Sequence, residues 1–383
     1  MYYNNETKEN CMKKMKNWRP SASLLAGAAV LGLLVLLVPI VRIMRDAVPF
    51  SDDYGYGYFA KLGYLMGKNL PGVLMGVWEN VKHTWWTWQG TYSSIFLMSL
   101  VPLVWGEQYY FWGLLFILLL LIGGVFALVK ALVVDVLQGG WQQCLYIQAV
   151  TAALVVELMY YPAEGLFWYN GGIHYVGMHG FAMLLLASLI CLSEGKMSRI
   201  RKGLLIAASM ILSLIVAGSN YVTALQTFLV FLTIMVAGAL LHRNIKGLLR
   251  LVPAFCVYSI GFYKNLAAPG NTARAEALGN PGMAPLQAIL FSFKEAFSHM
   301  WEYTGWMTIV VMLVLLPMIL QLVSTTKFRF RLPWLLPVWS VCLYATGFTS
   351  SLYSLGHGGV PRTLNAVKIT WQVLLVVNEI YLV

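Results

Sequence analysis

Charged residues are scarce in this chain: only 11% of its 383 residues are Asp, Glu, Lys or Arg, while 59% are hydrophobic. Ordinary soluble domains carry about 25% charged residues, so the composition excludes that class. Apolar runs recur along the sequence, and a run of about 20 residues is enough to cross a hydrocarbon core of roughly 30 Å. The composition therefore predicts a polytopic membrane protein.

Cysteines are also few, and the five of them are scattered without metal-ligand spacing or a disulfide framework. No internal repeat and no low-complexity linker divides the chain. We therefore predict a single transmembrane domain over residues 1–383. No cofactor is expected, although the sequence leaves a divalent metal open. The net charge of +11 comes from short basic clusters between apolar runs, so we expect the lipid bilayer and no nucleic acid as a partner.

The apolar runs predict an all-α bundle of about ten transmembrane helices. The first run exceeds the apolar core of a signal peptide and carries Arg42 and Arg45 at its far end, so we predict a retained helix. The run 94–105 is short and contains Pro102, which predicts a re-entrant or interfacial helix. The ten runs cover residues 22–44, 111–133, 144–160, 178–192, 204–218, 223–241, 248–262, 307–323, 332–348 and 364–383.

Clusters of Lys and Arg predict which loops face the cytoplasm. One cluster lies in the N-terminal residues 1–21, and the others lie within 196–202, 243–250 and 327–331. Two apolar runs separate successive later clusters, so the N-terminus and all four clusters are predicted to be cytoplasmic. The loops 45–92 and 263–305 then become extracytoplasmic. An amphipathic pattern over 286–300 predicts a helix along the outer interface within the second of these loops.

Two adjacent carboxylates, Asp52 and Asp53, follow the first apolar run. Acidic residues are rare so close to hydrocarbon and often mark a functional site. Repulsion between neighbouring carboxylates raises one pKa, which suits a general base or a cation ligand. The alternative is a solvated loop in which Ser51 or Asp52 caps the next helix.

Aromatic and polar side chains gather in the same predicted outer loops. An interfacial aromatic belt accounts for Trp85 and Trp86 without any function, whereas an aromatic face beside an amide also suits a sugar. His174, in a glycine-rich loop at 164–175, could titrate near neutrality, although a lone loop histidine is more often structural. The candidate sugar- or acceptor-binding residues are Tyr54, Trp88, Gln89, Asn170, His174, Asn220, Asn271 and His357.

Basic residues in two later outer loops predict a phosphate site. Arg274 follows a Pro269-Gly270-Asn271 sequence that is typical of a tight turn. Arg362 lies at the mouth of the last apolar run, with Lys368 further in. Guanidinium groups bind phosphate in a bidentate manner, so these three cations are the candidate donor-phosphate ligands.

These motifs, taken in order, resemble the bacterial membrane family known as domain of unknown function 6056. The resemblance rests on Ser-Asp-Asp-Tyr at 51–54, Trp-x-Gly at 88–90, Ser-Asn-Tyr at 219–221, Ala-Pro-Gly-Asn-x-x-Arg at 268–274 and Pro-Arg-Thr-Leu-Asn at 361–365. One departure is Thr91, where related sequences often carry Arg. The family is similar to the GT-C glycosyltransferases, and this implies a GT-C-like first outer loop, a catalytic acidic residue there and a bacterial plasma membrane location.

The sequence and the resemblance together predict a membrane glycosyltransferase. It would move a sugar from a polyprenyl-phosphate-linked donor to a cell-envelope glycan or lipid acceptor on the extracytoplasmic side. Asp52 and Asp53 are the predicted catalytic residues, with Asp53 preferred as the base and Asp52 as its orienting neighbour. Two alternatives stay open, a transporter or flippase of lipid-linked saccharides and a polymerase of such saccharides.

Overall fold

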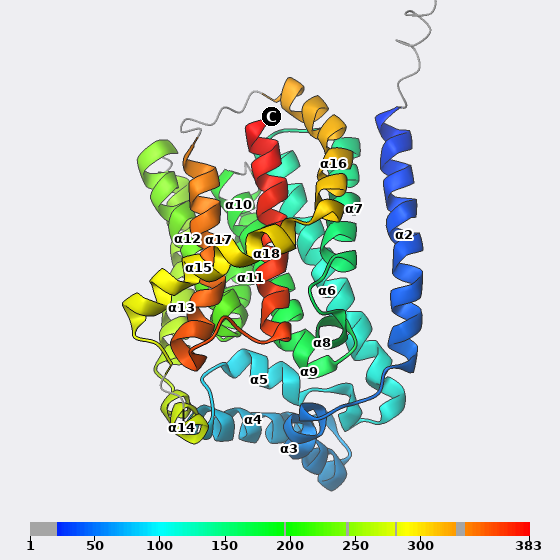
Figure 1. The fold of residues 1–383 in the computed structure, drawn as a ribbon. Helices are drawn as coiled ribbons and strands as arrows, with labels where there is room; N and C mark the ends of the chain where they lie inside the picture. Colours follow the sequence, from blue (N-terminus) through cyan, green and yellow to red (C-terminus); the bar gives the residue numbers. More distant parts are fainter. Residues whose placement is uncertain (1–20, 195–196, 243–244, 280–281, 327–333) are drawn as a thin grey trace, which may run out of the picture.

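The computed structural model describes residues 21–194, 197–242, 245–279, 282–326 and 334–383. In this part of the chain the regular structure is helical, and most of the helices run side by side in one bundle (Figure 1). Eight helical segments are long and apolar enough to cross a membrane. The chain is therefore an all-α, multi-pass membrane protein, as its composition predicts.

Each of the ten predicted apolar runs corresponds to a helix of the bundle. Eight of these helices coincide with the segments that meet the length and hydropathy expected of a span. The ninth is only 17 residues long, and the tenth carries several polar residues. The ten are α2 (Ala22–Asp46), α6 (Tyr110–Lys130), α7 (Trp141–Glu157), α10 (Met178–Glu194), α11 (Arg199–Ala217), α12 (Tyr221–Ala237), α13 (Ile245–Leu266), α16 (Trp306–Thr325), α17 (Leu335–Leu355) and α18 (Pro361–Leu382).

Four shorter helices gather at one end of the bundle, which we call the α3–α4 end (Figure 1). They are α3 (Asp52–Gly67), α4 (Leu70–Thr87), α5 (Tyr92–Ser99) and α14 (Pro269–Leu278). The first and last described residues both lie at the opposite end. With only eight residues, α5 is too short to span a bilayer. The structure thus has a short helix that overlaps residues 94–105, as the sequence predicts, and its place relative to a membrane stays a prediction.

Helices α3 and α4 form an antiparallel hairpin whose backbones lie very close together. A Cβ atom at Gly63 would lie 2.0 Å from the carbonyl oxygen of Gly72, and one at Gly76 would lie 2.1 Å from that of Phe59. Such contacts require glycine, because any side chain would separate the two backbones. The hairpin therefore presents the start of α3 and the end of α4 side by side.

The predicted loop over residues 164–175 is wrong, because most of it is helical. α8 (Pro162–Leu166) is followed by α9 (Tyr169–Gly172), a π-helical turn, η4 (Ile173–Gly177), and then α10. Gly171 packs against the ring of Trp168, and Gly172 packs against Ile117. These glycines let the helix approach its neighbours closely, so Asn170 and His174 lie buried in a helix rather than exposed in a loop.

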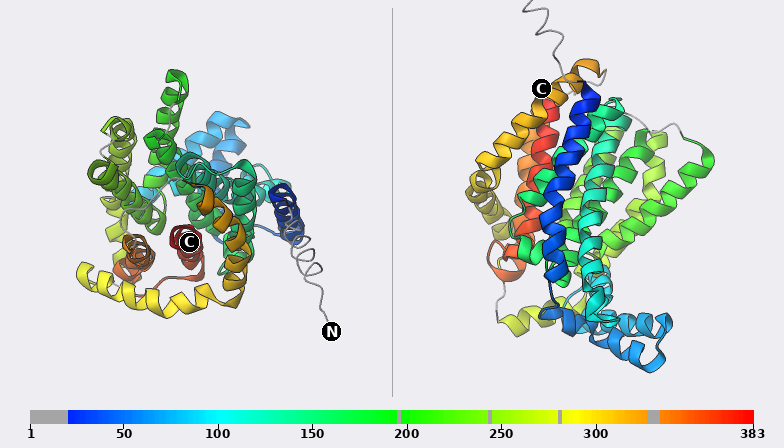
Figure 2. Two further views of the ribbon diagram at one scale, coloured as in Figure 1. Left: turned by 90° about the horizontal axis from the view of Figure 1, so that it is seen from above. Right: turned by 90° about the vertical axis from the view of Figure 1, so that its right-hand side faces the viewer.

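Two further predictions need correction. Pro269 occupies the first turn of α14, so Pro-Gly-Asn begins a helix instead of forming an isolated turn. The predicted interfacial helix is α15 (Pro285–Thr304), and it runs across the side of the bundle against α17 and α18 rather than along the α3–α4 end (Figures 1 and 2). Its inner face carries small residues such as Ala288 and Ala296, while Leu290 and Phe297 are exposed on the outer face. This apolar outer face is suited to contact with lipid.

The basic clusters that predict orientation lie only partly in the described structure. Residues 1–20 and 327–333, as well as Lys196 and Arg243, lie outside the described residues. The clusters that begin α11 and α13 follow helices that run away from the α3–α4 end. They therefore share an end of the bundle with the start of α2.

Candidate functional site

Asp53, in the first turn of α3, is completely buried, and both of its carboxylate oxygens accept hydrogen bonds. Its Oδ2 accepts hydrogen bonds from Tyr110 Oη at 2.7 Å and from the Phe50 amide at 3.0 Å, and its Oδ1 accepts one from the Asn170 amide at 3.0 Å. Burial raises the pKa of Asp53 above its usual range, and these hydrogen bonds oppose the shift. Asp53 therefore joins α3 to α6 and α9.

Asp52 precedes this buried carboxylate and is exposed. Ser51, just before it, has φ of 47°, a strained conformation for a residue with a side chain. Burial and the Asp52 carboxylate raise the pKa of the Tyr56 phenol to about 12, whereas the Arg274 and Arg362 guanidinium groups oppose this shift. One phenol thus lies within electrostatic reach of Asp52 and both arginines.

Arg274 is held against the end of α4. Its Nη1 donates a hydrogen bond of 2.8 Å to Gln89 Oε1, and its guanidinium carbon lies 5.3 Å from the centroid of a Trp88 ring. Gly270 lets α14 approach the end of α4 closely. A Cβ atom at this position would lie 2.6 Å from the Trp88 amide nitrogen and 2.8 Å from the Trp85 carbonyl oxygen. Gln89 and Trp88, predicted as sugar ligands, thus contact the cation that was predicted to bind phosphate.

Asn271 fixes the start of α14 with every hydrogen-bonding atom of its side chain. Its Nδ2 donates to the carbonyl oxygens of Asn265 and Leu266, each at 3.0 Å. Its Oδ1 accepts from the Gly90 amide at 3.0 Å and from Tyr221 Oη. Asn271, a predicted sugar ligand, is therefore a structural residue that positions Arg274.

Arg362 lies in the first turn of α18 and contacts α8 and the residues that follow it. Its backbone amide donates to Glu164 Oε2 at 3.0 Å, and its Nη1 lies 3.7 Å from the same oxygen. Its guanidinium carbon is 5.6 Å from the centroid of a Trp168 ring. Trp168 Nε1 in turn donates to the Phe50 carbonyl oxygen at 3.1 Å. This chain of contacts connects Arg362 to the segment that begins α3.

Several buried polar atoms around these groups have no hydrogen-bond partner within the described residues. They include both side-chain polar atoms of Asn170, Nδ1 of His174, the hydroxyl groups of Thr91 and Ser94, and Nε of Arg274. Buried polar groups are normally satisfied, so each exception needs an explanation. His174 also lies within electrostatic reach of Arg274 and Arg362. These unpartnered atoms have almost no exposed surface, so a ligand reaches them only after neighbouring side chains move.

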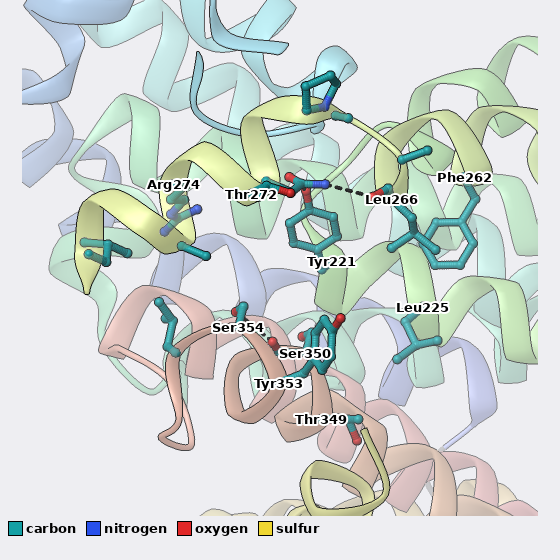
Figure 3. Close-up of a pocket in the computed structure, with 17 residues that line it drawn as sticks. Tyr221, Leu225, Phe262, Leu266, Thr272, Arg274, Thr349, Ser350, Tyr353 and Ser354 are labelled. Atoms are coloured by element: carbon teal, nitrogen blue, oxygen red, sulfur yellow. Dashed lines mark hydrogen bonds between the residues drawn. The ribbon is translucent and has the colours of Figure 1, made fainter. Parts of the chain in front are cut away.

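A cavity of about 650 Å³ lies between α12, α13, α14 and α17. Figure 3 shows Thr272 and Arg274 of α14 on one side and Ser350, Tyr353 and Ser354 of α17 on the other. Leu225, Phe262 and Leu266 line its apolar part, so the cavity is amphiphilic. The complete lining is Tyr221, Leu225, Phe262, Leu266, Ala267, Ala268, Pro269, Asn271, Thr272, Arg274, Ala275, Leu278, Thr349, Ser350, Tyr353, Ser354 and Leu355.

Four other predicted residues are placed apart from this group or have other contacts. Asn220 caps α12, with its side chain bonded to the His174 carbonyl oxygen and to Thr223. Lys368 faces α15, where its Nζ lies 5.6 Å from the centroid of the Tyr303 ring. The remaining two, Tyr54 and His357, are exposed. His357 accepts a hydrogen bond from the Gly359 amide within its own loop.

Three side chains of this site escaped the sequence analysis. Tyr56 lies one helical turn after Asp52, so recognising α3 as a helix would have placed it on the same face. Tyr110 lies at the start of α6 and looks like an interfacial aromatic residue in the sequence. Glu164 reveals its role only through its contact with Arg362, nearly two hundred residues away.

Among the residues that the structure describes, no group of three or more His, Cys, Asp or Glu side chains could hold a metal ion. The arrangement instead offers an exposed carboxylate, two guanidinium groups and a set of unpartnered polar atoms. Compared with models of known protein families, with curated proteins and with solved structures, the chain matches none of them.

Proposed function

We propose that this protein is a glycosyltransferase that takes a sugar from a polyprenyl-phosphate-linked donor at the extracytoplasmic surface. The observation that supports this best is the amphiphilic cavity, which combines an apolar wall between membrane-spanning helices with Arg274 at its polar side. A lipid phosphate needs both features at once, hydrocarbon contacts for its chain and a cation for its head group. A free sugar would need no such apolar wall.

In this proposal Asp52 is the general base. Asp53, which the sequence favoured for that role, has its two oxygens occupied by three donors and has no exposed surface. Asp52 is exposed and lies within electrostatic reach of the phenol that both arginines also affect. Asp53 then acts as the anchor that fixes the first turn of α3 and, with it, Asp52.

The transfer would proceed as a displacement at the anomeric carbon. Asp52 takes the proton of an acceptor hydroxyl while that oxygen forms the new glycosidic bond, and the bond from the anomeric carbon to the phosphate oxygen breaks. The polyprenyl phosphate leaves as an anion beside Arg274 and Arg362. Fixed guanidinium groups stabilise this developing charge without reorganisation.

The decisive experiment compares Asp52→Asn with Asp46→Asn. Asp46 ends α2 at the same end of the bundle and is also exposed. Removing a general base typically lowers the rate by about 10²- to 10⁴-fold, so membranes with Asp52→Asn should lose transfer of labelled sugar from polyprenyl phosphate. Asp46→Asn should retain it.

Mass spectrometry of lipid-linked sugars in cells with and without the gene provides the outcome that would contradict the proposal. Loss of one sugar substituent from the cell envelope supports a transferase. Accumulation of an intact lipid-linked saccharide on the inner leaflet, together with full activity of Asp52→Asn, would instead indicate a flippase.

A further inference from the structure

A second cavity, of about 530 Å³, lies between α4, α5, α10 and α11, and we call it the α4–α11 groove. Its walls are almost entirely hydrocarbon and include Trp85, Phe96 and Phe181. Its polar groups are already engaged, since Tyr92 Oη donates to the Leu214 carbonyl oxygen at 3.0 Å and the neighbouring Ser93 hydroxyl donates to another α11 carbonyl. The groove therefore offers a ligand apolar contacts and few hydrogen bonds.

The surface around the groove is suited to a lipid chain. Its α11 wall continues into the lipid-facing side of a membrane-spanning helix, where Ile211 and Leu214 are 61% and 51% exposed. Its other rim carries Lys82, which pairs with Glu79 at 2.7 Å while both side chains remain about half exposed. A chain with its tail along α11 would place its head group beside these charges at the α3–α4 end, and this agrees with the depth at which tryptophans favour the interface.

The groove also lies near the proposed base. In the α3–α4 hairpin, Asn80 Nδ2 donates to the Tyr56 carbonyl oxygen at 3.1 Å. Asp52 lies one turn before Tyr56, so the antiparallel pairing sets it beside the turn of α4 that follows Asn80. That turn begins at Val81 and ends just before Trp85, and both of these residues line the groove.

Helix α4, together with α14 packed on it, separates the groove from the cavity at Arg274. The Trp85 carbonyl oxygen faces Gly270 of α14, while the Trp85 side chain lines the groove. Arg274 stacks on Trp88, one turn further along. The groove thus borders α4 directly, whereas the cavity at Arg274 lies beyond α14, which packs on α4. Lys82 at the groove is paired with Glu79, so Arg274 is the cation that we assign to the donor phosphate.

We infer that the α4–α11 groove receives the hydrocarbon chain of the acceptor, so that the sugar passes from one membrane lipid to another. This inference rests on the proposed transferase function and adds the class of acceptor. The lipid chain would hold the acceptor hydroxyl near Asp52, while the donor occupies the cavity beyond α4 and α14. Holding both reactants in this way accelerates a bimolecular step.

The first test uses photo-crosslinking in nanodiscs that contain phosphatidylglycerol with a diazirine in the middle of one acyl chain. Crosslinks should concentrate on α4 and α5 residues of the groove, relative to the lipid-facing residues Leu31 and Val35 of α2. Ile215→Trp fills the groove from α11, whereas Ile211→Trp adds the same ring one turn away on the lipid-facing surface. Losing the contacts of about two methylene groups should lower the groove signal about tenfold in Ile215→Trp, with Ile211→Trp unchanged.

The second test measures the sugar-bearing product of the same variants in membranes. Ile215→Trp should lower the yield of lipid-extractable product about tenfold, while crosslinking of a diazirine-labelled polyprenyl phosphate to α14 stays at the wild-type level. Leu97→Trp, which fills the groove from α5, should behave in the same way and guards against a folding defect of a single variant.

The inference is overturned if groove crosslinks are no stronger than those on α2, or if Ile215→Trp and Ile211→Trp give equal product. Recovery of the sugar in a water-soluble product at an unchanged rate would also overturn it. Failure of the proposed function looks different, because wild-type membranes would then form no sugar-bearing product, or Asp52→Asn would form as much as wild type, whatever the groove binds.

Discussion

At the scale of single residues, Asp52 and Asp53 carry the same carboxylate group but differ in burial and in hydrogen bonding. Successive residues of a helix point about 100° apart, so the first turn of α3 directs one carboxylate inward and leaves the other exposed. The sequence indicates that the pair is unusual. Which of the two is buried depends on Tyr110 and Asn170, which bond to Asp53 and come from distant parts of the chain.

Asp53→Asn should destabilise the protein. The amide retains one acceptor oxygen, and its NH₂ group faces a donor that previously bonded to a carboxylate oxygen. Leaving a buried polar group unsatisfied costs about 1–3 kcal/mol, so the midpoint of thermal unfolding in detergent should fall. Asp52→Asn is the matched control and should keep the wild-type midpoint, and equal midpoints for both variants would contradict the anchoring role.

The stability contribution of Asp53 should depend on pH. Burial raises its pKa above the usual 3.8, so the folded protein holds this proton more tightly than the unfolded chain does. The resulting stabilisation is complete below the unfolded pKa and is lost as the pH rises towards the folded pKa. The difference in unfolding midpoint between wild type and Asp53→Asn should therefore shrink as the pH rises from about 4. A difference in unfolding midpoint that grows with pH would show that folding lowers the pKa of Asp53 instead of raising it.

At the scale of elements, close helix packing decides where the cations lie. The sequence is a good predictor of the membrane-spanning helices, because a long apolar run has few other stable states in lipid. It fails at glycine-rich segments such as 164–175 and at Pro269 to Asn271, because the same residues suit a turn or a tightly packed helix. Which of these forms depends on the surface that the glycines face.

Gly270→Ala should impair the site through the position of α14. The added Cβ would meet backbone atoms of α4 at less than 3.0 Å, so α14 must move and the hydrogen bond from Arg274 to Gln89 should weaken. A displacement of about 1 Å can cost up to about 100-fold in activity. Transfer should therefore fall, with a higher KM for the donor.

Gly55→Ala in α3 is the control for this substitution, because a Cβ atom at Gly55 would meet open space. It should leave KM and rate unchanged. Wild-type kinetics in Gly270→Ala would show that the close approach of α14 and α4 is unimportant for the site.

At the scale of the whole molecule, the helices bring Asp52, Arg274 and the start of α18 to one end of the bundle (Figure 1). Asp52 precedes the other two by more than two hundred positions in the chain, and the directions in which the intervening helices run bring all three to the same end. The first and last described residues lie at the opposite end of the bundle.

Membrane orientation can be measured by labelling single cysteines in a background without the native cysteines. Lys68→Cys, in the turn between α3 and α4, should react with a membrane-impermeant maleimide in intact cells, because that turn is exposed at the proposed extracytoplasmic end. Gln138→Cys, in the exposed connection between α6 and α7, should react only after the membrane is permeabilised. The reverse pattern would place the Asp52 site in the cytoplasm.

The sequence by itself determined that this protein is a multi-pass helical bundle, because apolar runs in lipid must satisfy their backbone hydrogen bonds as helices. It also identified Asp52, Asp53, Arg274 and Arg362 as residues that need an explanation. Only the tertiary structure decided that Asp53 is an anchor, that Asn271 and Asn220 fix helix ends, and that α15 crosses the side of the bundle. Those outcomes depend on contacts between residues far apart in the chain, which local patterns of hydropathy and charge do not encode.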